Sequence, residues 1–239
     1  MDYRESHTDR GSDYDETLTT SPFDAYMARW EAIHVEKILC SRFPDGVDKY
    51  LDFACGTGRV TSLIAPHARV CVGVDISESM LDAAKRKLQT VRFVHADLTK
   101  EERDLGQFDL VSAFRFFGNA QAELRETVLG VLERLVAPGG YLLANNHRNP
   151  MALAHLILKA KGVEHEMDLT DSGFRTLLAR FGFQLVLRKP IGVWKYRGKL
   201  MCEAHRDESS EKRLETTFGA QSFASIAPDT IYLFRRPIR

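Results

Sequence analysis

The sequence lacks the features that mark exported, membrane-spanning or metal-binding chains. No uninterrupted apolar run approaches the ~18 residues that a membrane-spanning helix needs. The first residues contain neither an apolar signal core nor an arginine-rich leader. The four cysteines show no CxxC spacing, so we expect them to be reduced and free of metal. These absences lead us to expect a cytoplasmic protein without a membrane partner.

An excess of charge of either sign is also missing. The 33 Lys and Arg residues balance the 33 Asp and Glu residues, so the formal net charge is zero. The overall field therefore gives no attraction to nucleic acid, and we expect none as a partner. Apolar residues make up 44% of a 239-residue chain, which is enough for one sizeable α/β core. We find no signal for an oligomeric state.

The most distinctive segment, residues 49–75, reads as an apolar strand, a glycine turn, a helix and a second strand that ends on Asp75. Gly56 and Gly58 allow the turn backbone conformations that other residues adopt only at a cost, so a ligand can lie against the main chain. Asp75 follows Gly58 by 17 residues, close to the spacing at which nucleotide-binding folds place a carboxylate on ribose hydroxyls. The pattern predicts a site for an adenosine-containing cofactor.

The turn lacks the third glycine of a dinucleotide-binding fold, because Thr61 stands three residues after Gly58. Asp52, just before the turn, would repel a pyrophosphate but suits a sulfonium or ammonium group. The run Leu-Asp-Phe-Ala-Cys-Gly-Thr-Gly at 51–58 resembles the first motif of class I S-adenosylmethionine-dependent methyltransferases, and later segments up to residue 147 resemble the family's next strands. The resemblance implies an α/β, Rossmann-like fold: a seven-stranded, mostly parallel sheet with an antiparallel last strand and helices on both faces.

The resemblance also implies S-adenosyl-L-methionine as the cofactor. Asp75 would bind the ribose, and Ile76 would lie against the adenine. Asp97 would accept a hydrogen bond from the adenine amino group, and Leu98 would cover the ring. The cofactor-binding residues that the resemblance implies are Asp52, Ala54, Cys55, Gly56, Thr57, Gly58, Asp75, Ile76, Met80, Asp97, Leu98, Ala113 and Phe114.

The chain is predicted to form one domain with a polar start. We expect residues 1–20 to be flexible and residues 21–239 to form a single methyltransferase domain. Its expected parts are an N-terminal lid helix at 21–44, a cofactor-binding core at 45–147, and substrate-side segments with the C-terminal strands at 148–239, including an insertion at about 194–229.

The helix at 21–44 is predicted from apolar residues at a spacing of three to four, after a Ser-Pro pair typical of a helix start. In similar methyltransferases this helix folds over the cofactor and contacts the substrate. We therefore expect Tyr14, Tyr26 and Trp30 to contact the methyl acceptor. The alternative is a helix that only packs on the edge of the sheet.

Methyl transfer from a sulfonium is an in-line displacement that needs alignment and exclusion of water more than acid catalysis. Arg115, after the fourth strand, is the expected acceptor-binding and catalytic cation; the alternative is an arginine that points to solvent or pairs with a structural carboxylate. His147, after the fifth strand, is the expected general base, or else an orienting or structural histidine. Asn146 and Arg148 complete the expected substrate contacts. Metal is not expected, because the segment after the fifth strand supplies no acid.

These residues favour a small-molecule methyltransferase whose acceptor is polar and possibly anionic, with O-methylation favoured over N-methylation. The strand-four segment has no Asn/Asp-Pro-Pro-aromatic signature, which argues against DNA adenine methylation. Three alternatives stay open: an RNA or protein methyltransferase, a non-catalytic cofactor-binding scaffold or regulator, and a Rossmann oxidoreductase, which NADH binding would reveal.

Overall fold

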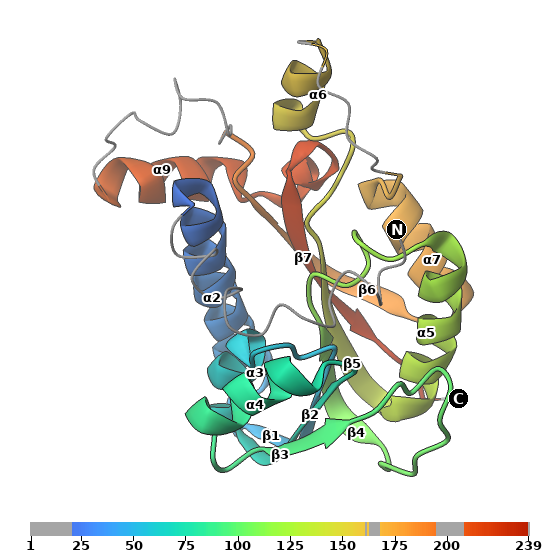
Figure 1. Cartoon of the computed structure of the whole chain (residues 1–239). Coiled ribbons are helices and arrows are strands. Elements are labelled where there is room, and N and C mark those ends of the chain that lie inside the picture. The colour runs from blue at the N-terminus through green and yellow to red at the C-terminus, as the bar shows by residue number, and fades with distance from the viewer. Residues whose placement is uncertain (1–20, 161, 163–167, 195–207, 239) are drawn as a thin grey trace.

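Seven strands form one sheet in the computed structural model, which describes residues 21–160, 162, 168–194 and 208–238 (Figure 1). The order across the sheet is β3-β2-β1-β4-β5-β7-β6. The strands are β1 (Val47–Phe53), β2 (Ala68–Asp75), β3 (Arg92–His95), β4 (Phe108–Ala113), β5 (Val136–Asn146), β6 (Gln184–Ile191) and β7 (Asp229–Arg235).

Strand direction follows the expected plan. The pairs from β3 to β5 are parallel, and β7 runs antiparallel to both β5 and β6. The strand order reverses between β1 and β4, and open α/β sheets bind ligands in the crevice at the carboxyl ends of the strands at such a point. The fold class predicted from the sequence is confirmed.

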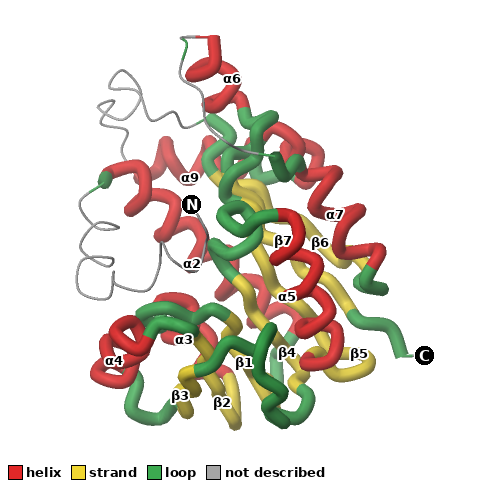
Figure 2. Tube along the Cα trace, turned by 45° about the vertical axis from the view of Figure 1, so that its right-hand side comes forward, coloured by secondary structure: helices red, strands yellow, loops and turns green. Residues whose placement is uncertain are grey.

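Helices cover both faces of the sheet (Figures 1 and 2). The segments α2 and α3 share an apolar cluster with one face, and α5 and α7 share a second cluster with the other. The helices are α2 (Pro22–Arg42), α3 (Arg59–Ile64), α4 (Glu78–Lys87), α5 (Ala122–Leu135), α6 (Leu153–Ala160), α7 (Asp171–Arg180) and α9 (Glu208–Phe218), with short 3-10 helices η1 (Ala65–His67) and η2 (Gln221–Ile226). Within the described ranges, no helix is long and apolar enough to cross a membrane.

Helix α2 begins where the sequence places it. The Ser21 side chain accepts a hydrogen bond from the Asp24 N–H at 3.3 Å, and Pro22 occupies the first turn. Near its start, the Tyr26 hydroxyl donates to the buried Glu215 carboxylate of α9. Glu215 also accepts from the indole N–H of Trp194 at 3.1 Å. These bonds join α2, α9 and the chain that follows β6.

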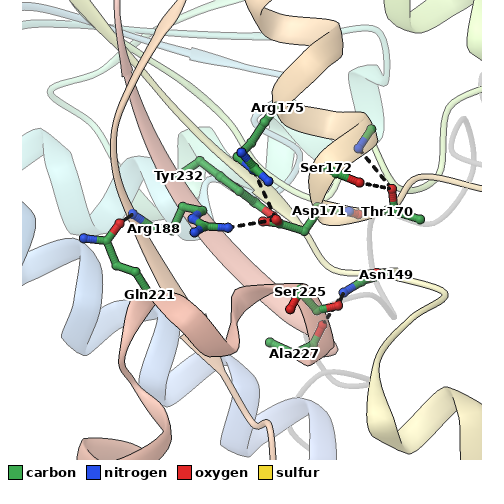
Figure 3. A network of polar contacts seen from close by, with 12 residues as sticks. Asn149, Thr170, Asp171, Ser172, Arg175, Arg188, Gln221, Ser225, Ala227 and Tyr232 are labelled. Carbon is green, nitrogen blue, oxygen red and sulfur yellow. Dashed lines mark hydrogen bonds and ion pairs between the residues drawn. The ribbon is translucent and has the colours of Figure 1, made fainter.

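The C-terminal half is held by the Asp171 cluster, which we define as Asp171, Arg175, Arg188 and Tyr232 (Figure 3). The Asp171 side chain is buried and accepts from Arg175 at 3.1 Å and Arg188 at 2.8 Å. Its second oxygen accepts from the Tyr232 hydroxyl at 2.9 Å. The cluster therefore ties the first turn of α7 to β6 and β7.

Strand β5 runs through the Pro-Gly-Gly segment at 138–140. The strand accommodates the run by a register shift against β4, between Phe108 and Leu110. The described part of the expected insertion at about 194–229 contains α9 and η2. Residues 1–20, including Tyr14, and the basic segment at 195–199 lie outside the described residues.

Candidate active site

The glycine turn after β1 is built from left-handed backbone. Ala54, Gly56 and Gly58 have φ values of 54°, 54° and 79°. A Cβ at Gly58 would lie 3.0 Å from a methyl carbon of Leu88 and 3.3 Å from the Cβ of Ala84, so glycine serves both the conformation and the packing there. The turn therefore presents main chain directly at the carboxyl end of β1.

Asp75, the last residue of β2, braces this turn. One carboxylate oxygen accepts from the Gly56 N–H at 2.7 Å, and the other accepts from the Ser77 N–H at 2.8 Å. The side chain is only 8% exposed. A carboxylate has about four lone-pair sites, so Asp75 keeps acceptor capacity for a ligand while its orientation is fixed.

Asp52 joins three elements beneath the turn. Its carboxylate accepts from the Thr61 hydroxyl of α3 and the Ser112 hydroxyl of β4, both at 2.6 Å. Burial raises the pKa of Asp52 to about 6, against the lowering effect of these two hydrogen bonds. A structural role in fixing the turn explains why the sequence carries an acid at this buried position.

A cleft that is open to solvent lies over these carboxyl ends. Eleven of the thirteen cofactor residues implied by the sequence line it, all except Gly58 and Ala113. Gly58 instead shapes the turn, and Ala113 is fully buried in β4. Residues from β1 to β4 that converge on the cleft are Asp52, Phe53, Ala54, Cys55, Gly56, Thr57, Arg59, Val60, Val74, Asp75, Ile76, Met80, Ala96, Asp97, Leu98, Thr99, Phe114, Arg115 and Phe116.

Comparison with known proteins bears on the cofactor-binding segment. The family model of the methyltransferase domain matches residues 51–140, the segment that carries the turn, Asp75, Asp97 and β4. The match confirms, for this segment, the resemblance to class I S-adenosylmethionine-dependent methyltransferases.

Individual relatives show how far the likeness extends. This chain is 33% identical over 127 residues to trans-aconitate 2-methyltransferase of Sinorhizobium fredii, covering 51% of this chain and 47% of that one. The chain spans about half the length of the curated relatives it matches. Magnesium protoporphyrin IX methyltransferase ChlM of Synechocystis PCC 6803, solved with bound S-adenosylhomocysteine, superposes with a TM-score of 0.67 at 16% identity, covering 98% of this chain and 97% of ChlM.

A second solved structure, the N-methyltransferase NodS of Bradyrhizobium japonicum WM9 with S-adenosylhomocysteine, gives a TM-score of 0.62 at 16% identity, covering 98% of this chain and 96% of NodS. These two likenesses establish the fold over nearly the whole chain. They show the architecture alone and do not identify the acceptor.

The residues that line this cleft fit S-adenosylmethionine. Asp75 and Asp97 line the cleft at the ends of adjacent strands, where hydroxyl and amino donors of an adenosine would meet carboxylates. Ile76, Met80 and Leu98 supply apolar cover for a ring. Acidic groups around the turn suit a cationic sulfonium and disfavour a pyrophosphate.

Arg115 is the cleft residue with the most unusual geometry. Its φ of 55° is left-handed, and Ala54 is the only other non-glycine residue in the described chain with a positive φ. The Arg115 N–H donates to the Asn145 side chain at 2.6 Å. Its side-chain Nε is buried without a hydrogen-bond partner, and no carboxylate of the described residues lies within 4.0 Å of its guanidinium. The sequence alternative of a structural ion pair therefore finds no support here.

The other expected acceptor contacts do not line the cleft. His147 packs against the backbone of Gly118, where an added Cβ would lie 3.2 Å from the imidazole ring. Arg148 donates to Asn119 at 3.1 Å, so both residues stand beside the loop that follows Arg115. The buried Asn146 amide donates to the Leu169 carbonyl at 2.6 Å, just before α7.

The two aromatic residues expected to reach the acceptor from α2 lie in the apolar cluster instead. Tyr26 and Trp30 are 4% and 7% exposed, and neither lines the cleft. The Tyr26 ring packs edge-on against Trp194 with centroids 5.6 Å apart. This arrangement matches the alternative of a helix that packs on the sheet.

Sequence reasoning missed three polar residues at this edge, Arg59, Glu31 and Asp229, whereas Asn145 was weighed as an acceptor contact or a turn residue. Arg59 lines the cleft and forms an ion pair with Glu31 of α2, whose side chain is fully buried. Asn145 bonds both Arg115 and the buried Asp229 of β7. The position of Arg59 directly after the turn was a usable signal. Glu31 and Asp229 gave none, because only the folded sheet brings them near the turn.

Asp229 makes the stability of the protein depend on pH. Burial, together with the charge of Glu31, raises its pKa to about 7, against the lowering effects of Arg115, Asn145 and Arg59. The folded pKa lies above the unfolded value near 3.9, so the stability contributed by this group falls as pH rises from about 4 through about 7. Replacing Asp229 by asparagine removes this ionisation cost.

We therefore expect Asp229→Asn to be more stable than the wild type at about pH 8, by a margin that shrinks at about pH 5. Urea denaturation of both proteins across this range measures the difference in unfolding free energy. The pH-dependent contributions of groups that both proteins share cancel in this difference. A difference in unfolding free energy that does not change with pH would contradict the assignment.

Proposed function

We propose that this chain transfers a methyl group from S-adenosylmethionine to a small polar molecule that carries an anionic group. The observation that carries the proposal is the guanidinium of Arg115, which lines the cofactor cleft with a buried Nε that lacks a partner. An unmet buried donor costs about 1–3 kcal/mol, so an acceptor oxygen that fills it gains that amount. A carboxylate or phosphate is the group that a guanidinium binds best.

Bound S-adenosylmethionine supplies an electrophilic methyl group on a positively charged sulfur. The chain's own residues then orient the nucleophile and exclude water, which are the main requirements of an in-line displacement. Phe114 and Phe116 line the cleft on either side of Arg115 and supply apolar walls. Asp75 and the glycine turn hold the cofactor end of the cleft.

We favour oxygen over nitrogen as the methylated atom. The residues that line the cleft include no histidine, lysine or tyrosine. Among the described lining residues, only the carboxylates that we assign to the cofactor could therefore remove a proton from the acceptor. An oxyanion is a nucleophile that needs no proton removed, unlike an ammonium group. The relative from Sinorhizobium fredii is named for a carboxylated acceptor, trans-aconitate, which supports beginning with such compounds.

Arg115→Ala tests the proposal. Screening of carboxylated and hydroxylated metabolites, with trans-aconitate first, by formation of S-adenosylhomocysteine would supply the acceptor. Losing charge-assisted bonds worth roughly 1.5–3 kcal/mol lowers kcat/KM for that acceptor about tenfold to a hundredfold. Arg180→Ala is the matched control, because Arg180 forms an exposed ion pair with Glu126 on α5. Unchanged kcat/KM in Arg115→Ala would overturn the role of Arg115.

A further inference from the structure

The backbone of Arg115 is held by two asparagine side chains. Asn145 accepts from its N–H at 2.6 Å, and Asn119 donates to its carbonyl at 2.7 Å. The left-handed conformation between these bonds is unfavourable for a residue other than glycine. Strain of this kind persists only where surrounding contacts impose it, and it gathers at functional sites.

Asn145 is in turn held by Asp229. The Asn145 amide N–H₂ donates to both carboxylate oxygens of Asp229, at 3.1 and 3.2 Å. Asn145 is fully buried and Asp229 is 2% exposed. The Arg115 peptide N–H can only donate and a carboxylate can only accept. The side-chain amide of Asn145 therefore satisfies both neighbours in one orientation, with its oxygen toward Arg115 and its N–H₂ toward Asp229.

Asp229 has no structural partner that would otherwise explain its burial. In the described chain, its carboxylate receives hydrogen bonds from Asn145 alone and makes no ion pair within 4.0 Å. Arg115 and Arg59 lie near enough for their charges to lower the pKa of Asp229, and Glu31 raises it. A buried carboxylate with one neutral donor is costly, unlike Asp171, which accepts from three side chains.

The three residues come from separate parts of the chain that meet at one edge. Arg115 follows β4, Asn145 lies near the end of β5, and Asp229 begins β7. The strands β4, β5 and β7 are neighbours in that order, and the antiparallel direction of β7 brings its first residue to the carboxyl ends of the other two. We call this chain of hydrogen bonds, from Asp229 through Asn145 to Arg115, the relay. It crosses the sheet from β7 to the cleft wall.

We propose that Asp229 and Asn145 are positioning residues, which fix Arg115 in its left-handed conformation and so present its guanidinium to the anionic group of the methyl acceptor. The presentation of the guanidinium to an acceptor rests on the proposed function; the relay that sets the backbone does not. Asp229 and Asn145 act through Arg115 and need not touch the acceptor. Acceptor specificity is then set in part from β7, far along the chain from the cofactor motifs.

Hydrogen exchange of the Arg115 amide tests the relay in the free protein, without an acceptor. Asn145→Ala and Asp229→Ala are each expected to speed this exchange at least about tenfold beyond the change in global stability. Asp229→Asn keeps an oxygen that accepts from Asn145, so its exchange stays within about threefold of the wild type. Asn149→Ala is the matched control, because Asn149 is 2% exposed but bonds the Ser225 and Ala227 carbonyls.

Kinetics with the acceptor from the screen tests the consequence. A relay that positions Arg115 predicts that Asp229→Ala and Asn145→Ala raise the acceptor KM about tenfold or more, with Asp229→Asn restored close to wild type. Binding of S-adenosylhomocysteine stays within about threefold in all four variants. Asn149→Ala loses stability while the acceptor KM is retained.

The outcomes separate the two proposals. Arg115 amide exchange that is unchanged in Asn145→Ala, or equally fast in Asp229→Asn and Asp229→Ala, overturns the relay. An intact relay by exchange, combined with full acceptor turnover in Arg115→Ala, overturns the proposed function of Arg115 and leaves the relay as a feature of the fold. Fast exchange in Asn149→Ala of the same size as in Asn145→Ala would show a general loosening and would also overturn the relay.

Discussion

Asp75→Ala is expected to weaken binding of S-adenosylhomocysteine at least about a hundredfold. Two effects of the substitution add. The carboxylate would lose its hydrogen bonds from the ribose hydroxyls, each worth roughly 1.5–3 kcal/mol. The Gly56 and Ser77 N–H groups, held by Asp75 at 2.7 and 2.8 Å, would also lose their acceptor, so the turn would be less ordered. Isothermal titration calorimetry measures the loss.

Asp82→Ala provides the control for this experiment, because Asp82 lies on α4 close in sequence but is exposed and, among the described residues, pairs only with Lys85 at 3.1 Å. Its affinity for S-adenosylhomocysteine should match that of the wild type. Circular dichroism confirms that Asp75→Ala is folded under the titration conditions. A folded Asp75→Ala protein that binds as tightly as Asp82→Ala would remove Asp75 from the cofactor site.

Asp171→Ala is expected to lower the free energy of unfolding by about 3–5 kcal/mol, the range for breaking a buried ion pair from one side. The substitution leaves two guanidinium groups, of Arg175 and Arg188, and the Tyr232 hydroxyl without the acceptor they share (Figure 3). Urea denaturation followed by tryptophan fluorescence measures the change.

Glu126→Ala is the matched control, since the Glu126–Arg180 pair is about half exposed on both sides and such pairs contribute about 0–1 kcal/mol. Asp171→Asn should fall between the two, because its amide oxygen still accepts one or two of the three bonds. A loss in Asp171→Ala no larger than that in Glu126→Ala would show that the Asp171 cluster does not hold α7 to β6 and β7.

The cofactor half of the site could be predicted because its determinants are local in sequence. The glycine turn, the strand before it and Asp75 lie within residues 49–75, and each follows from a short-range rule on glycine conformations or strand ends. The structure places these residues around one cleft. The antiparallel β7 was also predicted, although from the family resemblance and not from the residues alone.

The acceptor half depends on contacts between distant segments, which no local pattern encodes. Tyr26 is an aromatic residue with a hydroxyl group, as a substrate contact often is. In the structure that hydroxyl donates a hydrogen bond to Glu215, far along the chain, and the Tyr26 side chain is buried. Asn145 and Asn146 are neighbours in sequence, but strand alternation turns them to opposite faces, so one bonds Arg115 and the other Leu169.

Arg115 itself was predicted from its place after β4, but its left-handed backbone and the relay behind it were not. Both depend on Asp229 reaching the same edge through the pairing of β7 with β5. The pairing partner of a C-terminal strand follows from the complete sheet, and the charge environment of a buried acid follows from that pairing.

Calorimetric titration of the wild-type protein with S-adenosylhomocysteine, with NADH as the control, tests the central claim most directly. The account predicts micromolar binding of S-adenosylhomocysteine and no binding of NADH, because Asp52, Asp75 and Asp97 suit an adenosine without a pyrophosphate. Binding of NADH, or no binding of S-adenosylhomocysteine by the folded protein, would contradict it.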